Sequence, residues 1–404
     1  MKNGTTKQSM LRMVISASMA MGGVAAFVSP TAHSADNDAD GGWTFGGAIR
    51  GRYDYRSYVD PTVSRFSFDV FRLKAGYDSS TVFGSVQYRF YGGAYPYDYT
   101  SQFGRINFPE WAYVGYKVSP EHTITGGLNQ VPFGLLPYAS STFYETLGNL
   151  MGIEDVHNLG IKYQYKSGPV DLQLGFYPTD GGNWAGTSRD GNRYTYNIVD
   201  ADSYVVGGSN NEEKNLWVAR GAYTFTHSEE SSSEVGLSMM HSTIENHDTN
   251  EDGDRDAYAL HYLGKFGRLG VMAEYARQDM DPKNPAAVGN KTVTFGGFDG
   301  SFNVASKGDL YSVDLSYATD WKWRFISDVK PYVNYSIFVK DEDGFKDSER
   351  LLAGVQFSAG PLYIYTEYRL GKNDPFTGDY TQGAAAGGDD QWKRSLYMNI
   401  GYYF

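Results

Sequence analysis

Hydrophobic and polar residues alternate along most of the chain in short stretches, without a convincing helical period. In the final stretch, residues 394–404, Leu396 and Ile400 fall on one face and Ser395 and Asn399 fall on the other. A period of two is typical of a β-strand with one apolar face and one wet face. Reading such stretches in order predicts sixteen strands, near 42–57, 65–77, 81–91, 107–118, 122–130, 157–166, 170–177, 214–226, 234–245, 256–265, 269–279, 306–318, 329–340, 349–358, 361–371 and 393–404.

The connections between these expected strands alternate in length. Tight turns near 119–122 and 166–169 contrast with long connections such as 131–156 and 178–213. A transmembrane barrel shows this alternation because it has short periplasmic turns, long outer loops and an even number of strands. Closure also pairs every backbone polar group within the protein, as lipid requires. The pattern therefore predicts an all-β fold, a sixteen-stranded antiparallel transmembrane β-barrel, and the alternative is a secreted soluble β protein.

The N-terminal segment has a different pattern. Lys2, Lys7 and Arg12 precede an apolar stretch at about 13–28, and small residues follow it. This order is typical of a cleaved secretory signal, whereas an uncleaved anchor helix is disfavoured because the apolar run is short and contains glycine. We therefore divide the chain into a signal peptide, 1–35, and an outer-membrane barrel, 36–404, and expect the mature protein in the outer membrane of a Gram-negative cell.

Composition excludes several other classes of protein. The 404 residues include no cysteine, so a disulfide scaffold is excluded. The formal net charge is -12, and it becomes -15 when the three basic residues of the signal are removed, which argues against nucleic acid as a partner. No G-x-S-x-G motif surrounds a serine, and His241 and His261, on neighbouring expected strands, are the only polar pair considered for catalysis. We expect that the protein is not an enzyme.

Sixteen strands enclose a water-filled lumen rather than a packed core, so the polar face of each strand should line a pore. Seven cations then share one wall, formed by the first, second, third and fifteenth strands: Arg50, Arg52, Arg56, Arg72, Lys74, Arg89 and Arg369. Residue counting places Arg50, Arg89 and Arg369 at similar depth. Three further lumen cations come from other parts of the wall, and five carboxylates offset part of the charge: Lys162, Lys166, Arg220, Asp54, Asp69, Glu274, Asp314 and Glu367. These cations either select anions or merely solvate a wide lumen.

Two stretches carry a family resemblance. EWAYVGYKVSPEHTITGGLNQVPFG, residues 110–134, and HNLGIKYQYKSGPVDLQLGFY, residues 157–177, make the chain similar to the phosphate-selective porin family. FRLKAGY, with Arg72 and Lys74, resembles the second strand of that family. The resemblance implies a homotrimer that lies among outer-membrane lipid and lipopolysaccharide and passes small anionic or polar solutes by diffusion.

In sixteen-stranded porins as a class, the third outer loop folds inward and narrows the channel. The corresponding loop here, 131–156, contains no Lys or Arg and carries Glu145, Glu154 and Asp155. Family members that trap phosphate use a basic constriction loop, so this departure favours a general or mildly anion-preferring porin over a phosphate- or oxyanion-selective one. A surface adhesin or structural barrel is the third alternative, because loops 178–213 and 372–392 are rich in Gly and Asn.

One outer loop has the composition of half a calcium site. HDTNEDGDRDAY, residues 247–258, resembles the first half of a calcium-binding loop, with oxygen-bearing side chains at alternate positions around a glycine. Ala259 stands where a bidentate glutamate is expected. The loop is either a Ca²⁺ site or a solvated acidic hairpin tip, and no other cofactor is expected. The candidate ligands are Asp248, Asn250, Asp252 and Asp254.

Overall fold

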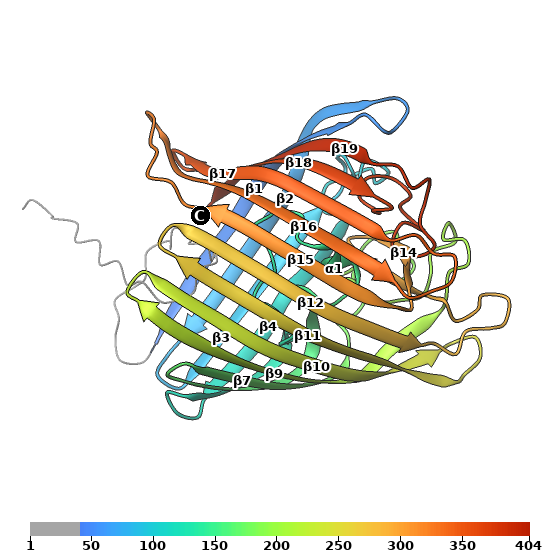
Figure 1. Ribbon diagram of the computed structural model, residues 1–404, viewed down its shortest axis with the longest axis horizontal. Coiled ribbons are helices and arrows are strands. Elements are labelled where there is room, and N and C mark those ends of the chain that lie inside the picture. Colours follow the sequence, from blue (N-terminus) through green and yellow to red (C-terminus); the bar gives the residue numbers. More distant parts are fainter. Residues whose placement is uncertain (1–40) are drawn as a thin grey trace, which may run out of the picture.

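The computed structural model describes residues 41–404, so the expected signal peptide, 1–35, lies outside the described residues. Sixteen strands form one closed antiparallel barrel in which they tilt around a common axis (Figure 1). They are β1 (Gly42–Arg56), β2 (Val63–Asp78), β3 (Val82–Tyr91), β4 (Ile106–Lys117), β5 (His122–Gln130), β6 (His157–Ser167), β7 (Val170–Thr179), β9 (Asn211–Ser228), β10 (Ser231–Asn246), β11 (Asp252–Phe266), β12 (Leu269–Asp281), β15 (Lys307–Tyr317), β16 (Ile326–Lys340), β17 (Ser348–Ala359), β18 (Leu362–Lys372) and β19 (Lys393–Tyr403). The predicted barrel and its strand count are confirmed.

The last strand closes the wall against the first. β1 and β19 pair from Ala48 with Tyr403 to Arg56 with Ser395. The main-chain N–H of Gly47 also donates to the carbonyl of Phe404 at 2.8 Å. The chain therefore ends inside the sheet because its last residues complete the hydrogen-bonded ladder, which leaves no open edge.

Residues outside the wall form a second, smaller sheet. Its strands, in the order β14–β13–β8, are β14 (Gly300–Ala305), β13 (Thr292–Gly297) and β8 (Asn197–Ile198). Hydrophobic alternation assigned these segments to open outer loops, so this sheet was not predicted. The described residues also include one short helix, α1 (Leu147–Leu150), within the long β5–β6 connection. None of the helices in the described chain has the length and apolar character needed to cross a bilayer.

Side chains alternate across the wall as the period of two predicts. Trp43, Leu172, Met239 and Val313 are among the large apolar residues exposed on the outer face. An apolar outer band on a closed barrel suits surrounding hydrocarbon. The opposite parity points into the lumen, where arginines, carboxylates and amides are buried.

The lumen is not uniformly open, and here the expectation of a water-filled interior needs correction. The β5–β6 loop and the small sheet pack against the inner face of the wall in a continuous apolar cluster, which includes Leu147 and Ile153 from the loop, Phe295 from β13, and Leu310 and Phe338 from the wall. Burial of these side chains stabilises the inward-folded segments by about 25 cal/mol for each Å² removed from water. One side of the interior is therefore filled, and the pore is confined to the other side.

Candidate functional site

The open side of the barrel contains a cavity of about 820 Å³. Most of the basic residues in its outer wall come from β1, β2, β3 and β18, with further lining residues on β4, β16, β17 and β19, and the β5–β6 loop, 131–156, forms much of the facing side. Eight basic side chains and five carboxylates line it: Arg50, Arg52, Arg56, Arg72, Lys74, Arg89, Lys330, Arg369, Asp69, Glu110, Glu145, Asp202 and Asp299. This set includes all seven cations assigned to one wall from strand parity. Their role in selectivity stays a prediction.

Three other predicted pore cations lie away from this cavity. Lys162 donates to the carbonyl of Gln130 at 2.9 Å, and Lys166 is exposed near the short β6–β7 turn. The guanidinium of Arg220 binds the carbonyl of Gly134 at 2.8 Å, so it anchors the start of the β5–β6 loop. These three cations are not part of the lining of the main cavity.

Two β-bulges insert carboxylates among the arginines. The β1–β2 register shifts between Arg50 and Gly51, so Asp69 is the extra residue on β2. The β3–β4 register shifts between Gln87 and Tyr88, so Glu110 is the extra residue on β4. A bulge bends the strand and re-aims side chains, and here both inserted carboxylates are buried inside the barrel. Glu110 was not identified from the sequence; the Pro109–Glu110 break in the alternation of β4 was the available signal.

These carboxylates neutralise part of the basic wall. Arg50 pairs with Asp69 at 2.9 Å, and Arg52 pairs with Asp54 at 2.6 Å. Arg89 donates to Glu110 through two of its nitrogens. Within residues 41–404, four cavity cations have no carboxylate within 4.0 Å: Arg72, Lys74, Lys330 and Arg369. The excess positive charge of the cavity therefore resides on these four side chains.

Aromatic rings support the guanidinium groups of the wall. The Arg89 guanidinium carbon lies 4.2 Å from the ring centroid of Tyr194, and that of Arg369 lies 4.2 Å from Tyr144. Cation–π contacts of this kind contribute about 0.5–2 kcal/mol each, more when they are desolvated. They fix planar groups that would otherwise sample many rotamers.

Strand pairing corrects the expected depth of one cation. Ser395 of β19 pairs with Arg56 of β1 on one side and with Arg369 of β18 on the other. Arg369 is thus in register with Arg56, near the long outer loops, and not with Arg50. Arg72, by contrast, pairs directly with Arg89. The basic side chains consequently run along the cavity rather than forming one ring.

The β5–β6 loop folds into the barrel, as expected for a third outer loop, and side chains of the wall hold its backbone. Ser238 accepts from the N–H of Gly134 at 3.0 Å. The Asp314 carboxylate accepts a hydrogen bond from the main-chain N–H of Ser141. In the same way, the Glu367 carboxylate binds the N–H of Phe143, and the Ser336 hydroxyl binds the N–H of Leu147. Arg255 and Arg350 donate to loop carbonyls: Met151, Gly152, Tyr144 and Thr146. Because peptide groups at both ends and in the middle of the loop are bound, the constriction is a fixed part of the lumen.

The three acidic residues of this loop do not share one role. Glu145 lines the cavity, whereas the Glu154 carboxylate caps the loop by accepting from the N–H groups of Ala139 and Thr146. Asp155 accepts a hydrogen bond from the Tyr194 hydroxyl. Burial, reinforced by the neighbouring carboxylates Asp155 and Glu154, raises the pKa of Glu145 well above its usual range. Glu145 is therefore largely protonated and neutral at pH values where an exposed glutamate is charged.

This shift predicts a pH-dependent selectivity. As the pH rises through the raised pKa of Glu145, its carboxyl ionises and adds negative charge to the cavity, so preference for anions should decline. Glu145→Gln should flatten this dependence, whereas Glu121→Gln, in the short β4–β5 turn, should leave it intact. Reversal potentials measured in a salt gradient from mildly acidic to alkaline pH test the prediction. Equal slopes in wild-type protein and Glu145→Gln would contradict it.

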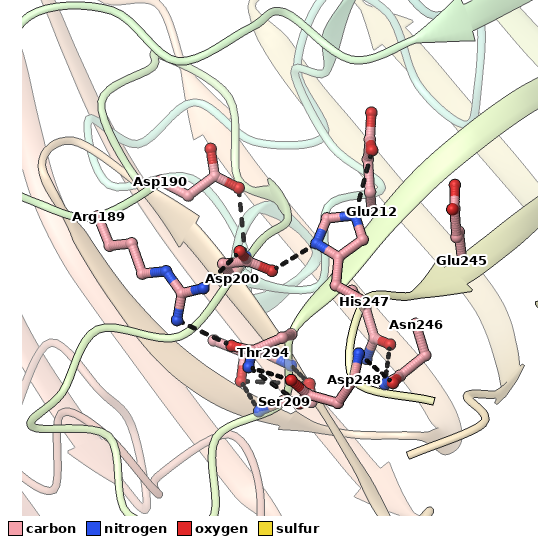
Figure 2. A network of polar contacts seen from close by, with 12 residues as sticks. Arg189, Asp190, Asp200, Ser209, Glu212, Glu245, Asn246, His247, Asp248 and Thr294 are labelled. Atoms are coloured by element: carbon pink, nitrogen blue, oxygen red, sulfur yellow. Dashed lines mark hydrogen bonds and ion pairs between the residues drawn. The ribbon is translucent and has the colours of Figure 1, made fainter. Parts of the chain in front are cut away.

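A polar network joins the outer segments around the mouth (Figure 2). His247, after β10, bonds Asp200 of the β7–β9 connection at 3.0 Å and Glu212 of β9 at 3.4 Å. Arg189 pairs with Asp200 at 2.9 Å. Burial lowers the pKa of His247, but the two carboxylates outweigh it and raise the pKa overall. The stability that protonated His247 contributes through this network is thus fully present at low pH, and it is lost as the pH rises through the raised pKa of His247.

The candidate calcium ligands do not form a ligand set. Within residues 41–404, no group of three or more His, Asp or Glu side chains is arranged to hold a metal ion. Asp248 instead accepts from the Asn210 amide at 2.9 Å, and Asp252 and Asp254 are exposed along β11. Calcium binding by Asp248, Asn250, Asp252 and Asp254 stays a prediction without structural support.

The two histidines considered for catalysis lie on opposite faces of the wall. His241 is exposed on the outer face beside Asp256. His261 is buried in the lumen and contacts Arg220 and Glu234. They therefore do not form the pair that the sequence allowed.

No family model matches the sequence, and no curated protein matches it. Solved structures do match the fold. The outer membrane channel DcaP of Acinetobacter baumannii is 11% identical with a TM-score of 0.61, over 92% of this chain and all of the other. OmpF of Salmonella typhi, in complex with daunomycin, is 13% identical with a TM-score of 0.61, over 92% of this chain and all of the other. An anion-selective porin from Comamonas acidovorans is 14% identical with a TM-score of 0.55, over 90% of this chain and all of the other. At these identities the similarity shows that this chain has the barrel fold of sixteen-stranded porins.

Proposed function

We propose that the protein is an outer-membrane porin through which small hydrophilic solutes and ions diffuse passively, with a mild preference for anions. The observation that supports this most directly is the lined cavity beside an inward-folded loop in a closed barrel. The apolar outer face suits a bilayer, and the polar interior suits water. A channel is favoured over an enzyme, because the two candidate catalytic histidines lie on opposite faces of the wall.

The anion preference is assigned to three of the four cavity cations that have no carboxylate partner among residues 41–404. Arg72, Lys74 and Arg369 lie on β2 and β18, in the wall of the cavity, and each has at least one aromatic ring beside its charged group. Fixed charge in a narrow passage between low-dielectric walls raises the local concentration of counter-ions. If these cations merely solvate a wide lumen, their charges should instead leave the ion flux unaffected.

A charge-removal experiment tests this assignment. The combined variant Arg72→Gln, Lys74→Gln and Arg369→Gln should move the reversal potential in a KCl gradient towards cation preference, because the remaining cavity arginines are mostly ion-paired. The control removes three exposed cations outside the cavity, Arg65→Gln, Lys117→Gln and Arg268→Gln. Equal reversal potentials in the two triple variants would contradict the assignment while leaving the barrel in place.

Phosphate selectivity is the second candidate, and one observation weakens it. The cavity side of loop 131–156 presents Glu145, Ser140 and Thr142 and no cation. Recognition of a phosphate dianion calls for several converging donors.

A homotrimer remains part of the proposal, on the strength of the resemblance, as does contact with lipopolysaccharide. Chemical cross-linking in detergent tests the trimer.

A further inference from the structure

We propose that the Arg72 guanidinium is a binding station for organic monocarboxylates that carry a ring, such as aromatic acids, on their way through the pore. This inference rests on the proposed diffusion function and names the class of solute that the cavity retains. It depends on three features of the lining: the net charge around Arg72, the buried guanidinium of Arg72, and the aromatic rings that surround it.

The charge count around Arg72 favours a single negative charge. Arg50 and Arg89 flank Arg72, and these three guanidiniums face two buried carboxylates, Asp69 and Glu110. Within this group of five side chains one unit of positive charge is left over, and Lys74, which also lines the cavity, lies two residues along the same strand. A monocarboxylate at Arg72 neutralises the charge of this group, whereas a dianion such as phosphate would exceed it and require a second cation.

Arg72 itself is a buried cation without a carboxylate partner in the part of the chain that the structure describes. Its side chain lines the cavity, and the residue is only 8% exposed. Its Nε is buried and has no hydrogen-bond partner among residues 41–404. An unsatisfied buried donor destabilises the protein, and a ligand carboxylate that accepts from it would relieve this cost. The planar fork of a guanidinium matches the two oxygens of a carboxylate, and such charge-assisted pairs are the stronger hydrogen bonds.

Aromatic rings surround this station. The guanidinium of Arg72 lies 5.3 Å from the Tyr403 ring, that of Arg50 lies 5.2 Å from Phe143, and that of Arg89 lies 4.2 Å from Tyr194. Tyr97 and Tyr99 line the same cavity. A solute bound through its carboxylate at Arg72 would therefore place its body among ring faces, where a planar apolar group gains contact that acetate or chloride cannot make.

Interruption of the chloride current through the reconstituted wild-type protein tests the proposal. Benzoate should interrupt the current at a concentration about tenfold lower than acetate does, because only benzoate adds the ring contact. Benzamide, which has the ring without the charge, should have no effect. An equal response to benzoate and acetate, or a stronger response to inorganic phosphate than to benzoate, would overturn the proposal.

Variants locate the station. Arg72→Gln should raise the required benzoate concentration about tenfold or more, since one charge-assisted pair is lost. Arg72→Lys keeps the charge but loses the fork, so it should fall between wild type and Arg72→Gln. Arg65→Gln, which removes an exposed arginine from the same strand, should respond as wild type. An unchanged benzoate response in both Arg72 variants would overturn the assignment to Arg72.

The diffusion function and the binding station at Arg72 can be tested separately. A protein that conducts chloride but does not respond to benzoate contradicts the station alone, and the diffusion function stands. A folded protein that does not conduct at all contradicts the diffusion function and the station with it.

Discussion

Replacing Arg350 by alanine should release the constriction loop and produce a larger, noisier ion current. Arg350, on β17, is fully buried and binds Asp374 at 2.7 Å and the carbonyls of Tyr144 and Thr146. Removing one partner of a buried ion pair costs about 3–5 kcal/mol, because the remaining charge is stranded. The cost falls on the loop and the β18–β19 connection, whose contacts with the wall are lost.

Single-channel recording measures this effect, and circular dichroism checks that the barrel persists, since the Arg350 side chain takes no part in the strand ladder. Arg277→Ala is the matched control, because Arg277 forms ion pairs with Asp309 and Asp341 on the outer face. Conductance and noise in Arg350→Ala equal to those of the control would show that the loop is held without this residue.

Removing the carboxylates at the two bulges should strongly increase anion preference. In the double variant Asp69→Asn and Glu110→Gln, the guanidiniums of Arg50 and Arg89 lose their ion pairs and face the pore as net charges. A charge pair at 4 Å is worth about 1 kcal/mol in water and more near a low-dielectric wall. Two such changes should raise the chloride-to-potassium permeability ratio about fivefold or more.

The control for this experiment removes the same formal charge at the periphery. Asp78→Asn and Asp98→Asn neutralise exposed partners of Lys117 and Arg65, outside the cavity lining. Their permeability ratio should stay close to that of wild type. A double variant at Asp69 and Glu110 with an unchanged ratio would mean that the paired arginines do not sense the permeating ions.

The wall of the barrel was predictable from sequence because the pattern that marks each strand is local. Alternation with a period of two requires only neighbouring residues, and it located all sixteen wall strands and the closure through 393–404. The same parity placed Arg50, Arg72 and Arg369 inside. Short connections between strands left few alternatives for the topology.

The interior was less predictable because it depends on distant contacts. The β13–β14 hairpin pairs with β8 across about a hundred residues of sequence, and alternation cannot reveal such a partner. Parity also fails at a bulge, where one extra residue changes the face of every later side chain. For this reason Glu110 was missed and the ion pairing of Arg89 was not foreseen.

The depth of a side chain in the barrel also could not be predicted from sequence. Counting residues from the turns ignores the stagger between strands, so it aligned Arg369 with Arg50 although the ladder aligns it with Arg56. The filled half of the lumen likewise arises from apolar side chains such as Leu310 and Phe338, whose inward parity was visible but whose partners were not.

The sign of the reversal potential of the purified wild-type protein in a KCl gradient across a planar bilayer shows whether the pore prefers anions. A passage with fixed positive charge left over on cations such as Arg72, Lys74 and Arg369 should give a steady conductance and a potential of the chloride-preferring sign at neutral pH. A potential of the potassium-preferring sign, or a membrane that stays closed with the folded protein inserted, would contradict the account.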